Sequence, residues 1–307
     1  MSSKQCIIIG ASAAGMSAAI YLKRRGIDFE LISKDVGGEM ALSGIVENWP
    51  GIIHTTGLEL TQSFKQHIAS YDIVPKLLEI QKIEKSDNGF LVTTSKEAIE
   101  TQSLILATGG HPKKLGVPGE TEFYHKGLSY CTVCDGPIAK GKPVAIIGGA
   151  NSALEAALMM SKLSPTVFLL TKNAFMKGEN ILIEEVKKQA HIHLLLNAVT
   201  KEISGDQFVT RVSYTDAQTQ EIKTIDVQGV FIHIGLKPNS DMIADEWGVK
   251  NKTGEIVIDI TGKTQIPGFF AAGDVTHIPY KQLGIAAGQG ITAALSAINY
   301  LNTNGNK

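Results

Sequence analysis

The sequence predicts an α/β protein with two Rossmann-like, three-layer domains, the second inserted in the first. Residues 6–33 and 144–171 repeat one pattern, which is strand, glycine turn, helix and strand. The apolar runs Ile7–Ile9 and Val144–Ile147 are continuous, as in strands that a parallel sheet buries on both faces. Because such strands followed by helices are typical of nucleotide-binding units, we expect two domains of this kind.

Two further segments indicate where the chain passes between the domains. Residues 104–119 and 231–240 each end a strand in glycine followed by proline, which is typical of a chain leaving one unit for another. We therefore expect a first, discontinuous domain of residues 1–113 and 240–307, and an inserted domain of residues 114–239.

Composition narrows the class of protein. The 307 residues suffice for two domains, and 43% hydrophobic with 19% charged residues is typical of a soluble globular protein. The net charge of −1 comes from scattered residues and excludes a basic surface for nucleic acid or anionic lipid. The first apolar run stops at a glycine turn and no run approaches the ~18 residues of a membrane span, so we expect a cytoplasmic protein.

The first glycine turn, Gly10-Ala-Ser12-Ala-Ala-Gly15, follows a strand and opens a helix. Gly10 permits a tight turn and Gly15 permits close packing of helix on strand, so that backbone N–H groups at the helix start face a pyrophosphate. Ser12 replaces the middle glycine with a small side chain. The alternative is a tight turn that binds no ligand.

The last part of the chain adds a second polar candidate. Residues 266–275 are a strand that ends in Gly273-Asp274, where a carboxylate can accept hydrogen bonds from a sugar or ribityl chain. The alternative role for Asp274 is an N-cap of the following turn. Beyond it, Leu295, Ile298 and Leu301 recur at helical spacing and predict a closing helix.

A dithiol carries most of the chemistry. Cys131-Thr-Val-Cys134 holds two sulfurs close enough to form and break a disulfide, and Asp135 is placed to exchange a proton with a thiolate. A zinc site and an inert pair are the alternatives, but zinc needs two more ligands. Cys6 lies in a core strand, where a cysteine is typically a small buried apolar residue.

The chain resembles the low-molecular-weight thioredoxin reductases, which are FAD enzymes with an inserted pyridine-nucleotide domain. The resemblance spans almost the entire chain and rests on motifs in the family's order: GASAAG (10–15), VENWPG (46–51), ATGG (107–110), CTVCDG (131–136), GGANSALEAA (148–157), AAGDV (271–275) and KQ…AAGQG (281–290). It implies that Cys134 is the flavin-side thiol and that Cys131 attacks a protein disulfide. The closing helix would then start near the flavin.

The resemblance also implies a set of FAD-binding residues. Glu39 stands where the family has glutamine. The candidate set is Gly10, Ser12, Ala13, Ala14, Gly15, Ser33, Gly38, Glu39, Asn48, Thr108, Gly109, Gly273, Asp274, Lys281 and Gln282.

Two departures from the family concern the electron donor. Ala150 adds a methyl group where the family has glycine, and Lys172, Asn173 and Lys177 stand where NADPH-dependent members grip the 2′-phosphate with arginine. No acidic residue ends that strand, so the usual NADH signature is missing too.

The chain thus resembles members that lack NADPH-binding motifs, such as the ferredoxin-dependent flavin thioredoxin reductases and the deeply branching reductases. We expect a reductase of thioredoxin-like proteins whose FAD receives electrons from a donor other than NADPH, with reduced ferredoxin first. The alternatives are an NADPH-dependent reductase that uses Lys172 and Lys177, a dithiol oxidase that uses oxygen, and a flavin-binding interaction protein. Homodimers are common in the family, so we expect one.

Overall fold

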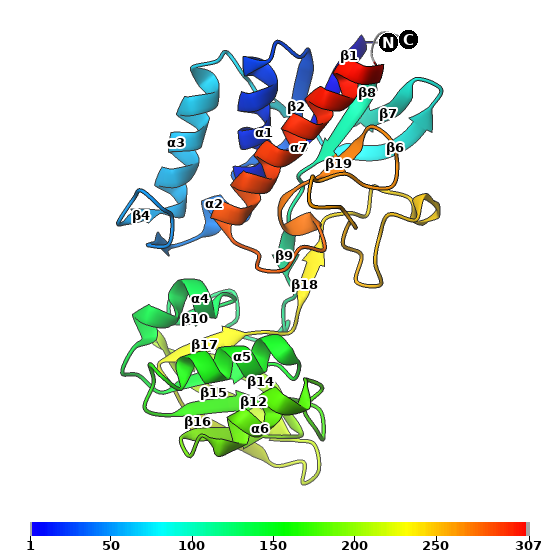
Figure 1. Ribbon diagram of the computed structural model, residues 1–307. Coiled ribbons are helices and arrows are strands. Elements are labelled where there is room, and N and C mark those ends of the chain that lie inside the picture. The colour runs from blue at the N-terminus through cyan, green and yellow to red at the C-terminus, as the bar shows by residue number, and fades with distance from the viewer. Residues whose placement is uncertain (1, 305–307) are drawn as a thin grey trace. The chain divides into compact units, whose positions relative to one another are not determined.

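The computed structural model describes residues 2–304, which form two compact units (Figure 1). Unit 1 contains Met1–His111 and Lys237–Lys307, and unit 2 contains Pro112–Leu236. Both units are layered α/β structures, so the predicted fold class is confirmed.

Unit 1 is built on a seven-stranded sheet with the order β5-β2-β1-β8-β7-β6, in which β19 pairs with β8. The strands β1, β2, β5, β8 and β19 run parallel, while β6 and β7 form an antiparallel hairpin against β8. Their bounds are β1 Ser2–Ala11, β2 Phe29–Val36, β5 Lys76–Leu77, β6 Ile80–Ser86, β7 Gly89–Thr94, β8 Ala98–Leu106 and β19 Phe269–Ala271. The carboxyl ends of the parallel strands therefore meet at one edge of the sheet.

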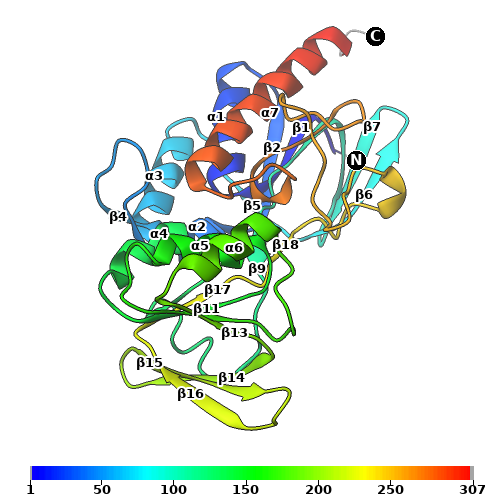
Figure 2. The same ribbon diagram turned by 60° about the horizontal axis from the view of Figure 1, so that its bottom comes forward.

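Three helices cover one face of this sheet: α1 Ala13–Arg24, α3 Gly57–Ala69 and α7 Leu283–Asn304. They lie side by side in both views (Figure 1, Figure 2). Ile8 of β1 packs into the core beneath the helices, and its neighbours Ile7 and Ile9 pack into the core on the opposite face, with Trp247. The prediction that this strand is buried on both faces is confirmed, and Cys6 is fully buried within it.

Short elements complete unit 1. They are α2 Glu39–Leu42, β3 Ile45–Val46, β4 Thr55–Thr56, and the 3₁₀ turns η2 Asp245–Trp247 and η3 Gly273–Val275. The last of these carries the predicted Gly-Asp pair.

Unit 2 has a parallel five-stranded sheet with the order β10-β17-β11-β12-β13. The helices α5 Asn151–Met160 and α6 Asn180–Lys188 pack on one face, and a three-stranded antiparallel sheet packs on the other, so one outer layer of this unit is a sheet. The parallel strands are β10 Leu128–Ser129, β11 Val144–Ile147, β12 Val167–Leu170, β13 Ile192–Leu195 and β17 Gly229–Ile232. The antiparallel strands are β14 Ala198–Gly205, β15 Val209–Asp216 and β16 Ile222–Asp226, and between β10 and β11 lie the short helix α4 Thr132–Asp135 and the 3₁₀ turn η1 Gly136–Ala139.

The chain crosses between the units twice. The crossings fall after His111 and after Leu236. They lie in β9 Gly110–Pro112 and β18 Leu236–Pro238, which pair with each other as a two-stranded ribbon.

Candidate functional site

The first glycine turn joins β1 to α1 and has room only for glycine at its two ends. Gly10 has a φ of 108°, and a Cβ there would lie 2.2 Å from the carbonyl oxygen of Ala107. A Cβ on Gly15 would lie 1.7 Å from the carbonyl oxygen of Gly10. Ser12 precedes the helix but donates its hydroxyl to Gly37 O at 2.6 Å, and makes no side-chain cap. The first N–H groups of α1 are thus free of a side-chain cap, as a phosphate site needs.

The end of β2 forms a second side of this turn. Ser33 accepts a hydrogen bond from Ala11 N at 3.2 Å, and Gly38 N donates to the Asp35 carboxylate at 3.1 Å. A Cβ on Gly38 would lie 3.7 Å from the Ser12 Cβ. The structure therefore brings Ser33 and Gly38 to the turn, as expected for residues of one site.

Gly273 and Asp274 form the third side. Gly273 has a φ of 77°, and a Cβ there would lie 3.2 Å from the Ala14 Cβ. Asp274 lies inside η3, whose N-cap is Ala272, so the alternative role as an N-cap is wrong.

The Asp274 carboxylate has no hydrogen-bond or ion-pair partner within residues 2–304. Burial raises its pKa above the ordinary value, and the nearby charge of Lys281 opposes this only in part. A carboxylate that the protein leaves unpaired at such a place costs stability, unless a ligand donates hydrogen bonds to it. The unpaired Asp274 carboxylate fits the hydroxyl-rich chain of a flavin dinucleotide. The uncapped start of α1 beside it fits the pyrophosphate.

Thr108 and Gly109 follow β8 at the same edge. Thr108 donates its hydroxyl to Asn239 O at 2.6 Å, and the Asn239 side chain donates back to Thr108 O at 2.8 Å. Gly109 has a φ of 67°, with no atom within 4 Å of a Cβ built there. Asn239 was missed by the sequence analysis, although it directly follows Pro238 in a segment recognised as a linker.

Asn48 and Gln282 are joined by a hydrogen bond of 3.2 Å although they are far apart in the sequence. Glu39 is the exposed first residue of α2.

Lys281, one of the predicted FAD-binding residues, is bonded to other groups of unit 1. Its amino group pairs with Glu255 at 3.1 Å and donates to the carbonyl oxygens of Thr276 and Ile278, at 2.5 and 2.9 Å. These bonds tie down the loop between Asp274 and α7. We therefore describe Lys281 as a residue that positions this loop, and Glu255 as its partner that the sequence analysis missed.

The dithiol lies in unit 2 at the start of α4. Cys131 and Cys134 form a disulfide with their Cα atoms 5.3 Å apart. Cys134 N donates to Cys131 Sγ at 3.1 Å. Asp135 accepts a hydrogen bond of 2.5 Å from the Ser129 hydroxyl, which in turn accepts from Cys131 N at 3.0 Å. Ser129, another residue missed from the sequence, thus connects the proposed proton donor to the backbone of the first cysteine.

Metal-binding geometry is not found around the dithiol or elsewhere in residues 2–304, where no group of three histidine, cysteine or acidic side chains could hold an ion.

The second glycine turn joins β11 to α5. A Cβ on Gly148 would lie 2.2 Å from the carbonyl oxygen of His233, and one on Gly149 would lie 2.5 Å from the Thr171 hydroxyl. Packing inside unit 2 therefore demands both glycines whether or not a nucleotide binds. Ala150 is the exposed N-cap of α5 in extended backbone, with a φ of −115°.

The end of β12 lacks a group that grips phosphate or ribose firmly. Thr171 is buried there, and its hydroxyl accepts hydrogen bonds from the backbone and side-chain nitrogens of Asn173, at 3.3 and 3.2 Å. Lys172 and Lys177 are exposed. The two flexible ammonium groups provide positive charge here, but they cannot make the planar, bidentate contact that an arginine guanidinium makes with a phosphate.

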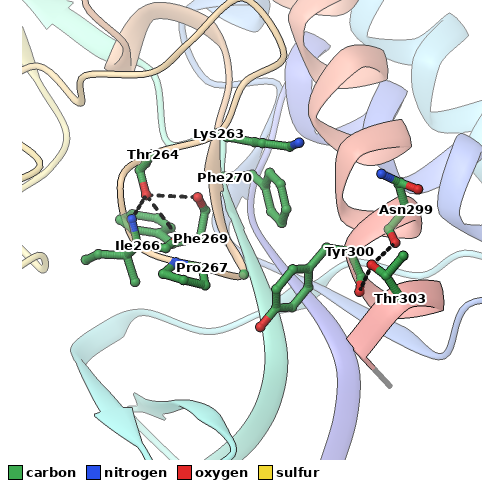
Figure 3. A pocket seen from close by; sticks show the side chains of 10 residues that line it. Lys263, Thr264, Ile266, Pro267, Phe269, Phe270, Asn299, Tyr300 and Thr303 are labelled. Carbon is green, nitrogen blue, oxygen red and sulfur yellow. Dashed lines mark hydrogen bonds between the residues drawn. The ribbon is translucent and has the colours of Figure 1, made fainter. Parts of the chain in front are cut away.

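A pocket of about 230 Å³ lies at the opposite ends of β19 and α7 from Asp274 (Figure 3). Phe269 and Phe270 line one side, and Asn299, Tyr300 and Thr303 of α7 line the other. None of the candidate site residues lines it, so this pocket is separate from the site.

The profile of the pyridine nucleotide-disulphide oxidoreductase family matches residues 4–297. The chain belongs to this family. It is a flavin-dependent oxidoreductase of the thioredoxin reductase-like type, and the sequence-based prediction of an enzyme of this class is confirmed.

Among relatives, this oxidoreductase is 40% identical over 299 residues to an NADH dehydrogenase of Ferdinandcohnia aciditolerans, covering 97% of this chain and 57% of that protein. It is 36% identical over 301 residues to a component of the alkyl hydroperoxide reductase of Pseudomonas aeruginosa, covering 96% of this chain and 58% of that protein. The oxidoreductase thus spans less than three fifths of the length of these relatives.

Among solved structures, thioredoxin reductase from Streptococcus pyogenes matches with a TM-score of 0.93 and 30% identity, covering 98% of this oxidoreductase and 99% of that chain. A ferredoxin-flavin thioredoxin reductase from Clostridium acetobutylicum matches with a TM-score of 0.55 and 27% identity, covering 99% and 100%. Within residues 2–304 of the oxidoreductase, every helix is too short or too polar to cross a membrane.

Proposed function

We propose that this oxidoreductase uses FAD to reduce protein disulfides of the thioredoxin type through Cys131 and Cys134. The observation that carries the proposal is the Cys131–Cys134 disulfide at the start of a helical turn, with Cys134 N–H directed at Cys131 Sγ. This N–H would donate a charge-assisted hydrogen bond to a Cys131 thiolate, which makes Cys131 the better nucleophile of the pair.

Unit 1 would hold FAD. The uncapped start of α1 would bind the pyrophosphate, and Asp274 would accept hydrogen bonds from the hydroxyl groups between the two rings. Bound FAD supplies a two-electron carrier between the donor and the disulfide. The remaining candidates around the turn would shape this cradle: Ser12, Ser33, Gly38, Thr108, Gly109 and Gly273.

Unit 2 would carry out the disulfide exchange in three steps. Two electrons and two protons convert the Cys131–Cys134 disulfide to two thiols. The Cys131 thiolate attacks a substrate disulfide and forms a mixed disulfide, releasing one substrate thiol. Cys134 then attacks Cys131 Sγ, restores the protein disulfide and releases the second thiol. Asp135, held by Ser129, is placed to accept and return the proton of a cysteine.

For the electron donor we propose reduced ferredoxin. Ala150 and the lysines at positions 172 and 177 weaken the case for NADPH, because a dinucleotide would lose a close backbone approach and a bidentate grip on its 2′-phosphate. The likeness to a ferredoxin-flavin thioredoxin reductase also supports this donor. NADH is the second candidate, because it has no 2′-phosphate to grip and one of the relatives is an NADH dehydrogenase.

Anaerobic reduction of the bound flavin tests the donor. The flavin absorbance would be followed after mixing with reduced ferredoxin, NADH or NADPH, and oxygen uptake with dithiols would be measured separately. We expect rapid bleaching with reduced ferredoxin and slow bleaching with NADPH. Rapid reduction at micromolar NADPH would overturn the donor proposal, and rapid reduction by NADH alone would replace it with the second candidate.

We also propose that the enzyme is a cytoplasmic homodimer whose substrate is a thioredoxin-like protein, on the strength of the likeness to thioredoxin reductases. Sedimentation of the purified protein tests the dimer.

A further inference from the structure

A threonine between the two cysteines is bonded to a histidine from another part of unit 2. Thr132 is the first residue of α4, is almost fully buried, and its hydroxyl is hydrogen-bonded to Nε2 of His233. Its neighbours Val133 and Cys134 are exposed, and Cys131 and Asp135 are partly buried. Thr132, together with the Ser129 hydroxyl described above, therefore anchors this short turn in the unit.

His233 is fixed by its own backbone. It follows β17, its N–H donates to Ile147 O at 2.7 Å, and its carbonyl oxygen lies where a side chain on Gly148 would otherwise extend. Burial lowers the pKa of the imidazole to about 4, so the ring is neutral near pH 7. One residue thus contacts the second glycine turn through its backbone and the dithiol turn through its side chain.

The conformation of the dithiol turn, residues 131–135, is only weakly stabilised by its own local hydrogen bonds. α4 has only four residues, and helices this short are not stable on their own. In the oxidised protein the disulfide closes the turn. After reduction that link is gone, and contacts such as the one from Thr132 to His233 must keep the two thiols near each other.

We propose that His233 is a positioning residue for the dithiol: through Thr132 it holds the reduced turn closed and thereby stabilises the Cys131–Cys134 disulfide relative to the open dithiol. Without this bond the reduced turn gains conformational freedom, which favours the dithiol. The inference rests on the proposed redox role of the cysteines, but it concerns the equilibrium of the pair itself.

The test measures that equilibrium without a donor or a protein substrate. The full-length holoenzyme is equilibrated anaerobically with mixtures of reduced and oxidised dithiothreitol, quenched with an alkylating agent, and scored by mass spectrometry for the Cys131–Cys134 disulfide. The variants are Thr132→Val, which keeps the shape and removes the hydroxyl, His233→Leu, the double variant, and Thr132→Ser, which keeps the hydroxyl. Thr200→Val is the matched control, because the Thr200 hydroxyl is buried in the same unit with no partner.

We expect Thr132→Val and His233→Leu each to lower the disulfide-forming equilibrium constant about tenfold, which raises the two-electron potential by about 30 mV. Thr132→Ser and Thr200→Val should stay within about twofold of the parent, and the double variant should shift no further than a single one. A constant unchanged in Thr132→Val, or shifted equally in Thr132→Ser, would overturn the proposal.

If Thr132→Val does not fold, Thr132→Ser and His233→Leu decide the matter, because serine retains the hydroxyl and leucine removes the imidazole. An altered constant in Thr132→Ser, or a parent-like constant in His233→Leu, would overturn the proposal, and a parent-like constant in Thr132→Ser together with a shift in His233→Leu would support it. A holoenzyme that shows these shifts yet reduces no thioredoxin-like protein would refute the proposed function and leave this inference standing.

Discussion

Asp274 is a carboxylate that unit 1 leaves without a partner among residues 2–304, at the point where three strand ends meet. Burial raises its pKa, so the folded protein without flavin disfavours the charge that the unfolded chain carries at neutral pH. This part of the apoprotein is therefore less stable than it could be, and binding of a ligand that donates hydrogen bonds would relieve the cost.

Replacing Asp274 with asparagine should separate stability from binding. We expect Asp274→Asn to stabilise the apoprotein by on the order of 1 kcal/mol, because the uncompensated charge disappears, and to weaken FAD binding at least tenfold. Thermal unfolding of the apoprotein and flavin titration measure the two effects. Asp241→Asn, at an exposed ion pair with Lys237, is the control and should change neither. A less stable apoprotein with unchanged flavin affinity would contradict the assignment.

The two cysteines should differ in the adducts they form. With Cys134→Ser, attack by Cys131 on an oxidised thioredoxin should stop at a mixed disulfide, because no resolving thiol remains. Non-reducing electrophoresis shows the adduct. A more abundant adduct with Cys131→Ser would reverse the two roles.

His233 should make unit 2 sensitive to acid. Its pKa falls from 6.5 to about 4 in the folded protein, so between these values the unfolded chain takes up a proton that the folded chain refuses. Stability should therefore be unaffected above pH 6.5 and fall as the pH drops toward 4, by on the order of 3 kcal/mol in total.

Hydrogen exchange of β11 and β17 at pH 6.5 and pH 4.5 measures this loss of stability. His233→Gln should show a smaller change between the two pH values than the parent protein, whereas an equal change would contradict the assignment.

At the scale of elements, α1 and α7 approach closely because small residues line their contact. A Cβ on Gly290 of α7 would lie 2.0 Å from the carbonyl oxygen of Ala14, whereas a Cβ on Gly288, two residues earlier, would meet nothing within 4 Å. The same helix thus holds one glycine that packing requires and one that it does not.

This pair gives a matched test of the packing. Gly290→Ala should destabilise unit 1 by about 1–3 kcal/mol, since the helices must move apart. Gly288→Ala should be neutral or stabilise it by up to about 1 kcal/mol through helix propensity. Chemical denaturation followed by tryptophan fluorescence reports on unit 1, because Trp49 and Trp247 both lie there. Equal effects of the two substitutions would show that the close contact is not maintained in solution.

The sequence predicted the elements whose pattern is local. The strands with continuous apolar runs, the glycine turns after them and the closing helix follow from spacing alone. The hairpin of β6 and β7 and the antiparallel sheet of β14, β15 and β16 were not predicted, although Asn88-Gly89 is a typical hairpin turn. The hairpin extends the sheet of unit 1, and the antiparallel sheet covers one face of the parallel sheet of unit 2; both arrangements depend on contacts between distant segments.

The candidate site shows the same division. Gly10, Gly15 and the dithiol are recognisable because their spacing is part of the chemistry. Glu255 and His233 are not, because each acts on a residue that is distant in the sequence, and only folding brings the pairs together.

At the scale of the whole molecule, unit 2 is one continuous segment with a core on each face of its own sheet. A protein consisting of residues 112–236 should therefore fold by itself and form the Cys131–Cys134 disulfide. Circular dichroism, cooperative thermal unfolding and thiol titration test this. A segment that stays unfolded would show that unit 2 needs unit 1, and its full-length parent is the control.

The paired crossings β9 and β18 have a consequence for the history of such proteins. Because the chain leaves unit 1 and returns to it through neighbouring strands, both ends of the inserted domain are attached at one place in the host domain. A gene segment encoding a different inserted module could be exchanged there without new connections in the host. The host domain and the inserted domain could then diverge at separate rates within one lineage.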